Sequence, residues 1–200
     1  MILTRYLYVK ELVENSLAAA ILEKHSYTEA AFWAYELYFS GFEQEVLTRL
    51  TDLYETRFTE NHPRLGIYLE KKSRELADKP ELIAIFVKNL TMKQPHIKES
   101  PSGKFVNVKP HHIISFMTKE LNGPNWKFLR EVCLYGVLGS LSMDINEWRE
   151  NWMVYAAGCP IWSKRMIDEL AYEDDSNFRD KYDYEPDEQP AEIRRKCIGI

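Results

Sequence analysis

Residues 30–42 read Ala-Ala-Phe-Trp-Ala-Tyr-Glu-Leu-Tyr-Phe-Ser-Gly-Phe. At about 100° per residue, Ala34 and Leu37 fall on one side of a helix, and the aromatic residues extend this apolar surface around most of its circumference. Glu29 and Glu36, seven positions apart, leave only a narrow strip for water. A helix with this pattern is normally buried by neighbours on several sides. The stretch therefore predicts the central helix of a packed helical protein.

Local signals extend this helical pattern along the chain. Ser26 and Glu29 have the spacing of a capping box before the central helix, and Gly41 is a suitable residue to end it. Apolar periodicity and helix breakers predict eight further helices, near residues 9–23, 43–57, 61–76, 80–90, 110–121, 125–141, 144–155 and 160–170. No internal repeat of the tetratricopeptide or HEAT length is found. The fold class is therefore predicted to be all-α, an irregular bundle or degenerate solenoid of about nine helices.

Two segments depart from this pattern. Between residues 92 and 109 prolines and a glycine interrupt the helical period, which predicts a short irregular or hairpin insertion in which Ile97 pairs with residues 105–108. After Ala171 the chain becomes acidic and polar, and such a segment buries little apolar surface. We therefore expect a helical domain over residues 1–171 with an insertion at 92–109. An acidic, partly ordered C-terminal tail is expected over 172–200.

Composition and targeting signals restrict the cellular setting. The net charge of −5 argues weakly against a general nucleic-acid coat. The three cysteines are far apart and form no Cys-x-x-Cys pair, which favours free thiols in a reducing compartment. The N-terminus lacks a signal-peptide hydrophobic region, and no apolar run is long enough to span a bilayer. An intracellular protein without a membrane span is expected.

The motifs of common enzyme classes are incomplete in this chain. His111 and His112 are adjacent, so on a helix they point about 100° apart and do not chelate one metal. Residues 101–104, Pro-Ser-Gly-Lys, end like a phosphate loop but lack its first glycine and the serine or threonine after the lysine. Residues 139–142 lack the second glycine of a nucleophile elbow. We therefore expect no catalytic residues, cofactor or metal site.

Charge is distributed unevenly along the second half of the chain. Residues 172–192 carry nine acidic side chains and two basic ones. Residues 88–112 carry only one acidic residue and five lysines, Lys88, Lys93, Lys98, Lys104 and Lys109. A basic segment together with an acidic tail is typical of nucleic-acid contact with self-shielding. Two solvated segments without a partner, or an intramolecular contact, would give the same pattern.

Three stretches resemble a known protein family. Residues 30–42, residues 157–162 (Ala-Gly-Cys-Pro-Ile-Trp) and residues 182–189 (Tyr-Asp-Tyr-Glu-Pro-Asp-Glu-Gln) are similar to an uncharacterised family encoded by large nucleocytoplasmic DNA viruses. The resemblance spans most of the chain. It implies a viral protein that acts in the cytoplasm of an infected cell or is packed in a virion. The family has no assigned activity, so the resemblance implies no catalytic residues.

These observations favour a non-enzymatic helical scaffold or adaptor for protein partners, because helix arrays commonly build grooves for partner segments. Tyr184, Glu185, Pro186 and Asp187 form a candidate linear motif for such contacts. The alternative is a nucleic-acid-associated factor that uses the lysines of residues 88–112.

Overall fold

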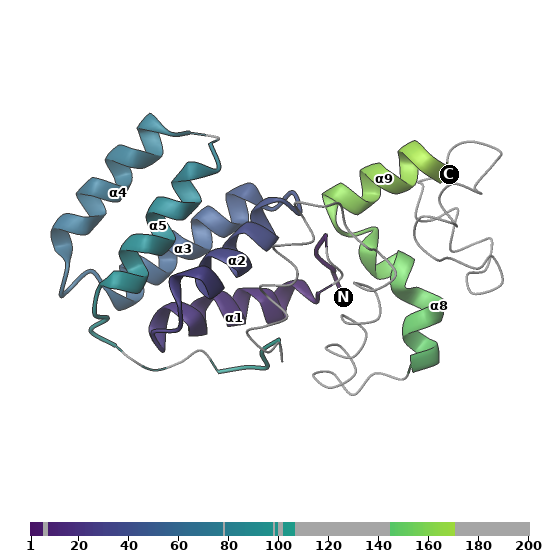
Figure 1. Ribbon diagram of the computed structural model, residues 1–200, viewed down its shortest axis with the longest axis horizontal. Coiled ribbons are helices and arrows are strands. Elements are labelled where there is room, and N and C mark those ends of the chain that lie inside the picture. Colours follow the sequence, from purple (N-terminus) through teal and green to yellow (C-terminus); the bar gives the residue numbers. More distant parts are fainter. Residues whose placement is uncertain (6–7, 78, 98, 100–101, 107–144, 171–200) are drawn as a thin grey trace. The chain divides into compact units, whose positions relative to one another are not determined.

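The computed structural model describes residues 1–5, 8–77, 79–97, 99, 102–106 and 145–170 (Figure 1). These residues contain seven α-helices and no β-strand, which confirms the predicted all-α class. The helices predicted at 110–121 and 125–141 and the acidic tail at 172–200 lie outside the described residues. The chain divides into two compact units. One is Leu12–Phe105, here called the helical unit, and the other combines Met1–Glu11 with Val106–Ile200.

The helical unit is built from five consecutive helices, drawn from purple to teal in Figure 1. They are α1 (Lys10–Leu22), α2 (Tyr27–Tyr38), α3 (Glu43–Arg57), α4 (Pro63–Glu75) and α5 (Glu81–Met92). Helix α2 packs against α3 and α5, and α5 also contacts α3 and α4. The predicted central helix therefore contacts other helices of the unit, as expected.

The two ends of α2 follow the predicted capping signals. Ser26 Oγ accepts a hydrogen bond from the N–H of Glu29 at 3.2 Å, which is one of the two hydrogen bonds of a capping box. The carboxylate of Glu29 lies 3.1 Å from Nδ1 of His25. At the other end Gly41 has a φ of +91°, and the N–H of the next residue donates to the carbonyl of Leu37 at 3.2 Å. This is the left-handed closure that glycine favours after a helix.

The water-facing side of α2 differs from the prediction. Glu36 is 0% exposed, so it does not face water. It shares one face with Trp33 and Ser40, three and four positions away, and both of these residues are also buried. Phe39 is 43% exposed and stacks on Tyr35 with ring centroids 5.5 Å apart. The helix buries the face that contains Glu36 because its neighbours cover that side, and it leaves the Tyr35–Phe39 face more open.

Helix α1 is buried even more completely than α2. Ten of its 13 residues are buried, including a run of three alanines at positions 18–20. Alanine side chains are small, so they allow neighbouring backbones to approach closely. The predicted apolar stripe of α1 is confirmed, and Asn15 is buried with it. The interior of the helical unit is therefore organised around both α1 and α2.

Lys24 joins the end of α1 to the end of α5. It follows α1 with a left-handed φ of +62°. Its ammonium group donates hydrogen bonds to the carbonyl oxygens of Thr91, at 3.1 Å, and of Lys93, and it lies 5.9 Å from the ring centroid of Phe58. A cation at the C-terminus of a helix satisfies carbonyls that have no partner within the helix. Partial burial of the ammonium group lowers the pKa of Lys24.

The segment after α5 is irregular where the structure describes it. Ile97, Phe105 and Val106 belong to no strand, so the predicted hairpin is not formed by these residues. The N–H of His96 donates to the carbonyl of Arg57 at 2.8 Å, and Asn15 Nδ2 donates to the carbonyl of Lys104 at 3.1 Å. The segment is thus attached to the helical unit at both of its described ends.

The other unit contains α8 (Ile145–Ala156), α9 (Pro160–Leu170) and the start of the chain. Residues Leu3 and Val9 form an isolated antiparallel bridge. The N–H of Leu3 donates to the carbonyl of Tyr155 at 3.2 Å, and Trp162 Nε1 donates to the carbonyl of Arg5 at 2.9 Å. The first residues are therefore fixed to α8 and α9, a contact that the sequence analysis does not predict.

Candidate functional site

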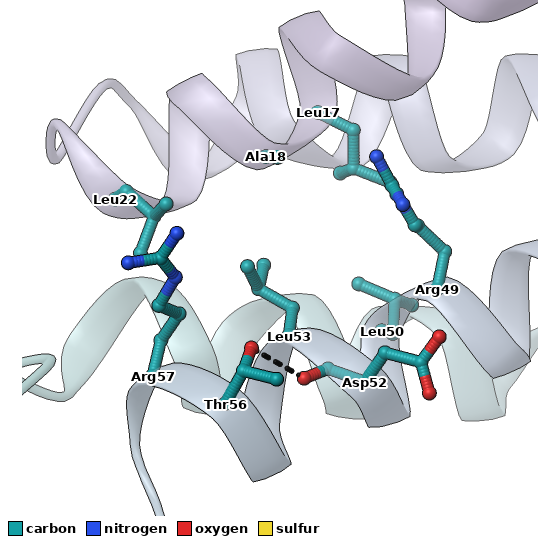
Figure 2. Close-up of a pocket in the computed structure, with 9 residues that line it drawn as sticks. All are labelled: Leu17, Ala18, Leu22, Arg49, Leu50, Asp52, Leu53, Thr56 and Arg57. Carbon is teal, nitrogen blue, oxygen red and sulfur yellow. Dashed lines mark hydrogen bonds between the residues drawn. The ribbon is translucent and has the colours of Figure 1, made fainter. Parts of the chain in front are cut away.

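A groove opens between α1 and α3 in the helical unit (Figure 2). Its volume is about 210 Å³. We call it the α1–α3 groove, and its lining residues are Leu17, Ala18, Leu22, Arg49, Leu50, Asp52, Leu53, Thr56 and Arg57. A cavity of about 150 Å³ already accommodates a benzene-sized group, so this groove has room for one large apolar side chain.

The α1–α3 groove has an apolar middle and a cation at each end. Figure 2 shows Arg49 and Arg57 extending from α3 toward α1 at opposite ends, with Leu53 between them. The two arginines are eight residues apart, which is about 12 Å along a helix. Neither guanidinium group makes an ion pair or hydrogen bond with any residue that the structure describes. Both are therefore available to an anionic partner.

The remaining polar residues of the groove are not arranged for catalysis. Thr56 Oγ1 donates to the backbone carbonyl of Asp52 at 2.7 Å, so its hydroxyl proton is used within α3. The Asp52 side chain is exposed. Nucleophilic catalysis needs a nucleophile and a base within hydrogen-bonding reach, and the lining offers no such pair. The arrangement is instead suited to holding an apolar group between two anions.

A second pocket lies between α4 and α5 and is here called the α4–α5 pocket. It is lined by Asn61, His62, Pro63, Arg64, Leu65, Tyr68, Asn89 and Lys93, and its volume is about 490 Å³. This is within the usual range for ligand pockets. Its lining includes two permanent cations, Arg64 and Lys93, and no carboxylate.

The structure separates the lysines that the sequence analysis grouped together. Lys93 lines the α4–α5 pocket, whereas Lys88 is exposed on α5, about 140° around the helix from the Lys93 position. Lys104 is exposed in the irregular segment. Lys98 and Lys109 lie outside the described residues, as does the candidate linear motif at 184–187.

Three residues of these two pockets escaped the sequence analysis. Arg49 and Arg64 were not singled out, and Tyr68, which helical periodicity places on one side of α4 with Leu65 and Leu69, is 41% exposed. The sequence contained one signal for the α1–α3 groove. Arg57 continues the apolar register of α3, and a cation in such a register indicates that one edge of the stripe meets solvent or a partner.

Metal-binding clusters and membrane-crossing helices are absent from the described part of the chain. No group of three or more histidine, cysteine, aspartate or glutamate side chains there is placed to hold a metal ion. The longest described helix, α3, has 15 residues, and no candidate for a membrane-crossing helix occurs among these residues. Cys159 is buried.

Comparison with known proteins gives no match to a protein-family model, to a curated protein or to a solved structure. The resemblance to a viral family therefore stays a prediction from the sequence.

Proposed function

We propose that this protein is a non-enzymatic helical adaptor that holds a short segment of a partner protein in the α1–α3 groove. The observation that carries the proposal is the position of Arg49 and Arg57 at the two ends of an apolar groove, where neither guanidinium group has a partner among the described residues. A segment with one apolar side chain between two carboxylates has the complementary chemistry. The sequence resemblance supports a partner found in an infected cell or a virion.

The spacing of the arginines indicates the pattern of the partner segment. An extended chain rises about 3.3 Å per residue, so four residues span about 13 Å, close to the separation of Arg49 and Arg57 along α3. Side chains at i, i+2 and i+4 of an extended chain point to the same side. Acidic residues at i and i+4 with an apolar residue at i+2 therefore place all three side chains toward the groove.

The size of the groove predicts a weak and reversible interaction. Full burial of one leucine-sized side chain contributes about 1.5–3 kcal/mol, and arginine–carboxylate pairs near the surface add about 1 kcal/mol or less each. Association must also offset lost translational and rotational freedom. These contributions add to about 5 kcal/mol at most, so binding with a Kd of about 0.1 mM or weaker is expected, which suits an adaptor that exchanges partners.

Selection from a random peptide-display library on the purified full chain tests the proposal. The groove variant is Arg49→Glu/Arg57→Glu, and the control is Lys79→Glu/Lys104→Glu. The control makes the same change in charge at two exposed positions outside the groove. Selected peptides should show the acid–apolar–acid pattern and should bind the control but not the groove variant. Peptides without this pattern, or equal binding to both variants, would refute the proposal.

A further inference from the structure

We infer that the α4–α5 pocket is a separate binding site for one nucleotide of a single-stranded nucleic acid. This goes beyond the adaptor function, because the two pockets share no lining residue. The pocket combines cations that suit a phosphodiester with an aromatic ring that suits a base.

The cations of the pocket are available to an anion. The side chains of Arg64 and Lys93 make no ion pair or hydrogen bond with the part of the chain that the structure describes. His62 is fixed at the rim, with Nε2 placed 3.0 Å from the carbonyl oxygen of Gln94. Because this oxygen accepts, Nε2 carries the proton. With no carboxylate in the lining, the pocket attracts a phosphate group.

Tyr68 supplies a surface on which a base can stack. Its side chain lines the pocket and is 41% exposed, although a large ring at this position of an amphipathic helix would normally be buried. The ammonium group of Lys72 lies 6.0 Å from the ring centroid and is held there by Glu75 Oε2 at 2.5 Å. A ring between cations is the arrangement with which proteins bind single strands.

The same geometry argues against a duplex. Bases in a duplex are stacked on one another and do not reach an aromatic side chain, whereas bases of a single strand can be splayed out onto it. Asn89 Nδ2 donates to the carbonyl of Ile85 at 2.8 Å, so part of its capacity to read a base edge is already used. We therefore expect preference for single strands and little preference for sequence.

Fluorescence anisotropy with labelled oligo(U) and oligo(dT) tests this inference on the full chain. The pocket variant Arg64→Glu/Lys93→Glu should bind about tenfold more weakly or worse, because it replaces two phosphate-binding cations with anions. The control Lys71→Glu/Lys79→Glu makes the same change in charge at two exposed positions outside the pocket and outside residues 88–112, and it should bind within about twofold of the unmodified protein. Equal losses in both variants would overturn the inference, since they would indicate diffuse electrostatic attraction.

Two further measurements test the phosphate-binding cations and the stacking ring separately. Each phosphate contact on a single strand contributes about 0.7 to the logarithmic salt slope, so Arg64→Gln/Lys93→Gln should flatten the slope by about 1.4. Tyr68→Ala should weaken binding about fivefold or more with the slope unchanged, while Tyr68→Phe should retain binding. Unchanged affinity in Tyr68→Ala would overturn the inference. Thermal unfolding checks that each variant is folded.

Competition by two other ligands tests whether the bound nucleotide belongs to a single strand, belongs to a duplex or is free. Uridine monophosphate should compete at least about tenfold more weakly than oligo(U), because a strand supplies phosphates on both sides of the stacked base. A duplex of the same length should also compete more weakly than the single strand. Equal competition by the mononucleotide would overturn the inference in favour of a free-nucleotide site. Equal competition by the duplex would overturn it in favour of a phosphate surface that does not select single strands.

Discussion

Gly66 shows how one residue fixes the contact between α3 and α4. Its N–H donates to the hydroxyl oxygen of Tyr54 at 2.9 Å, and that hydroxyl lies 3.2 Å from the carbonyl oxygen of His62. A Cβ at position 66 would lie 2.7 Å from the same hydroxyl oxygen and 2.9 Å from a ring carbon. Real Cβ atoms essentially never approach so closely. The absence of a side chain here lets the phenol reach the backbone of α4.

Gly66→Ala should therefore destabilise the protein. Alanine is a better helix former by about 1 kcal/mol, but the crowding against Tyr54 costs about 1–3 kcal/mol, so a net loss of about 1 kcal/mol is expected. Urea unfolding of Gly66→Ala, Tyr54→Phe and the double variant measures this. The double variant should lose less than the sum of the single losses, because the two residues share one contact. A more stable Gly66→Ala protein would contradict this account.

At the scale of helices, the ends of an element follow from the sequence where the signals are local. Ser26 and Gly41 act at the ends of α2 as predicted, and α4 and α9 begin at Pro63 and Pro160. Each signal works through hydrogen bonds or sterics within a few residues. The exposure of Glu36 was predicted wrongly, because burial depends on which neighbours cover a face.

The two pockets required information that no single helix contains. Arg49 and Arg57 lie at the two ends of one groove only because α1 lies opposite α3. Arg64 and Lys93 are 29 positions apart in the sequence and meet because α4 contacts α5. Periodicity places a residue on a face of its own helix, but it does not identify the helix that faces it.

Lys24 allows a prediction at the same scale. Lys24→Met keeps most of the side-chain stem but removes the charged donor from the carbonyl groups of Thr91 and Lys93. A loss of about 1–2 kcal/mol in the free energy of unfolding is expected, because hydrogen bonds to charged groups contribute more than neutral ones. Hydrogen exchange should also accelerate in the last turn of α5.

Lys88→Met is the matched control for Lys24→Met. Lys88 is exposed on α5, the helix whose end Lys24 contacts, so its replacement should change stability by no more than about 0.5 kcal/mol. Equal effects of the two variants would show that Lys24 does not hold the end of α5.

At the scale of the whole molecule, the chain divides into two compact units, each with its own buried residues. Ala34 is 0% exposed in the helical unit, and Leu3 is 0% exposed in the other unit. The attachment of Leu3 to Tyr155 joins residues about 150 positions apart through backbone groups. Every residue except proline carries both of these groups, so no side-chain pattern in the sequence predicts this contact.

Substitutions in the two units should therefore act separately. Ala34→Asp places an unpaired carboxylate in the core of the helical unit and should cost several kcal/mol, about 3 or more. Leu3→Ala should cost about 2–5 kcal/mol in the other unit. Hydrogen–deuterium exchange on the full chain should show lost protection in α2 and α5 for Ala34→Asp, and in α8 and α9 for Leu3→Ala. Loss of protection throughout the chain in either variant would contradict two separate units.

The adaptor proposal is tested most directly by reversing the charges on both sides of the α1–α3 groove. A peptide selected on the unmodified protein is remade with lysine in place of its two acidic residues, and both peptides are titrated against the unmodified protein and Arg49→Glu/Arg57→Glu. We predict that each reversal alone lowers affinity by about tenfold or more, and that the doubly reversed pair regains most of it. Failure of the doubly reversed pair to bind, with both proteins folded, would contradict the account.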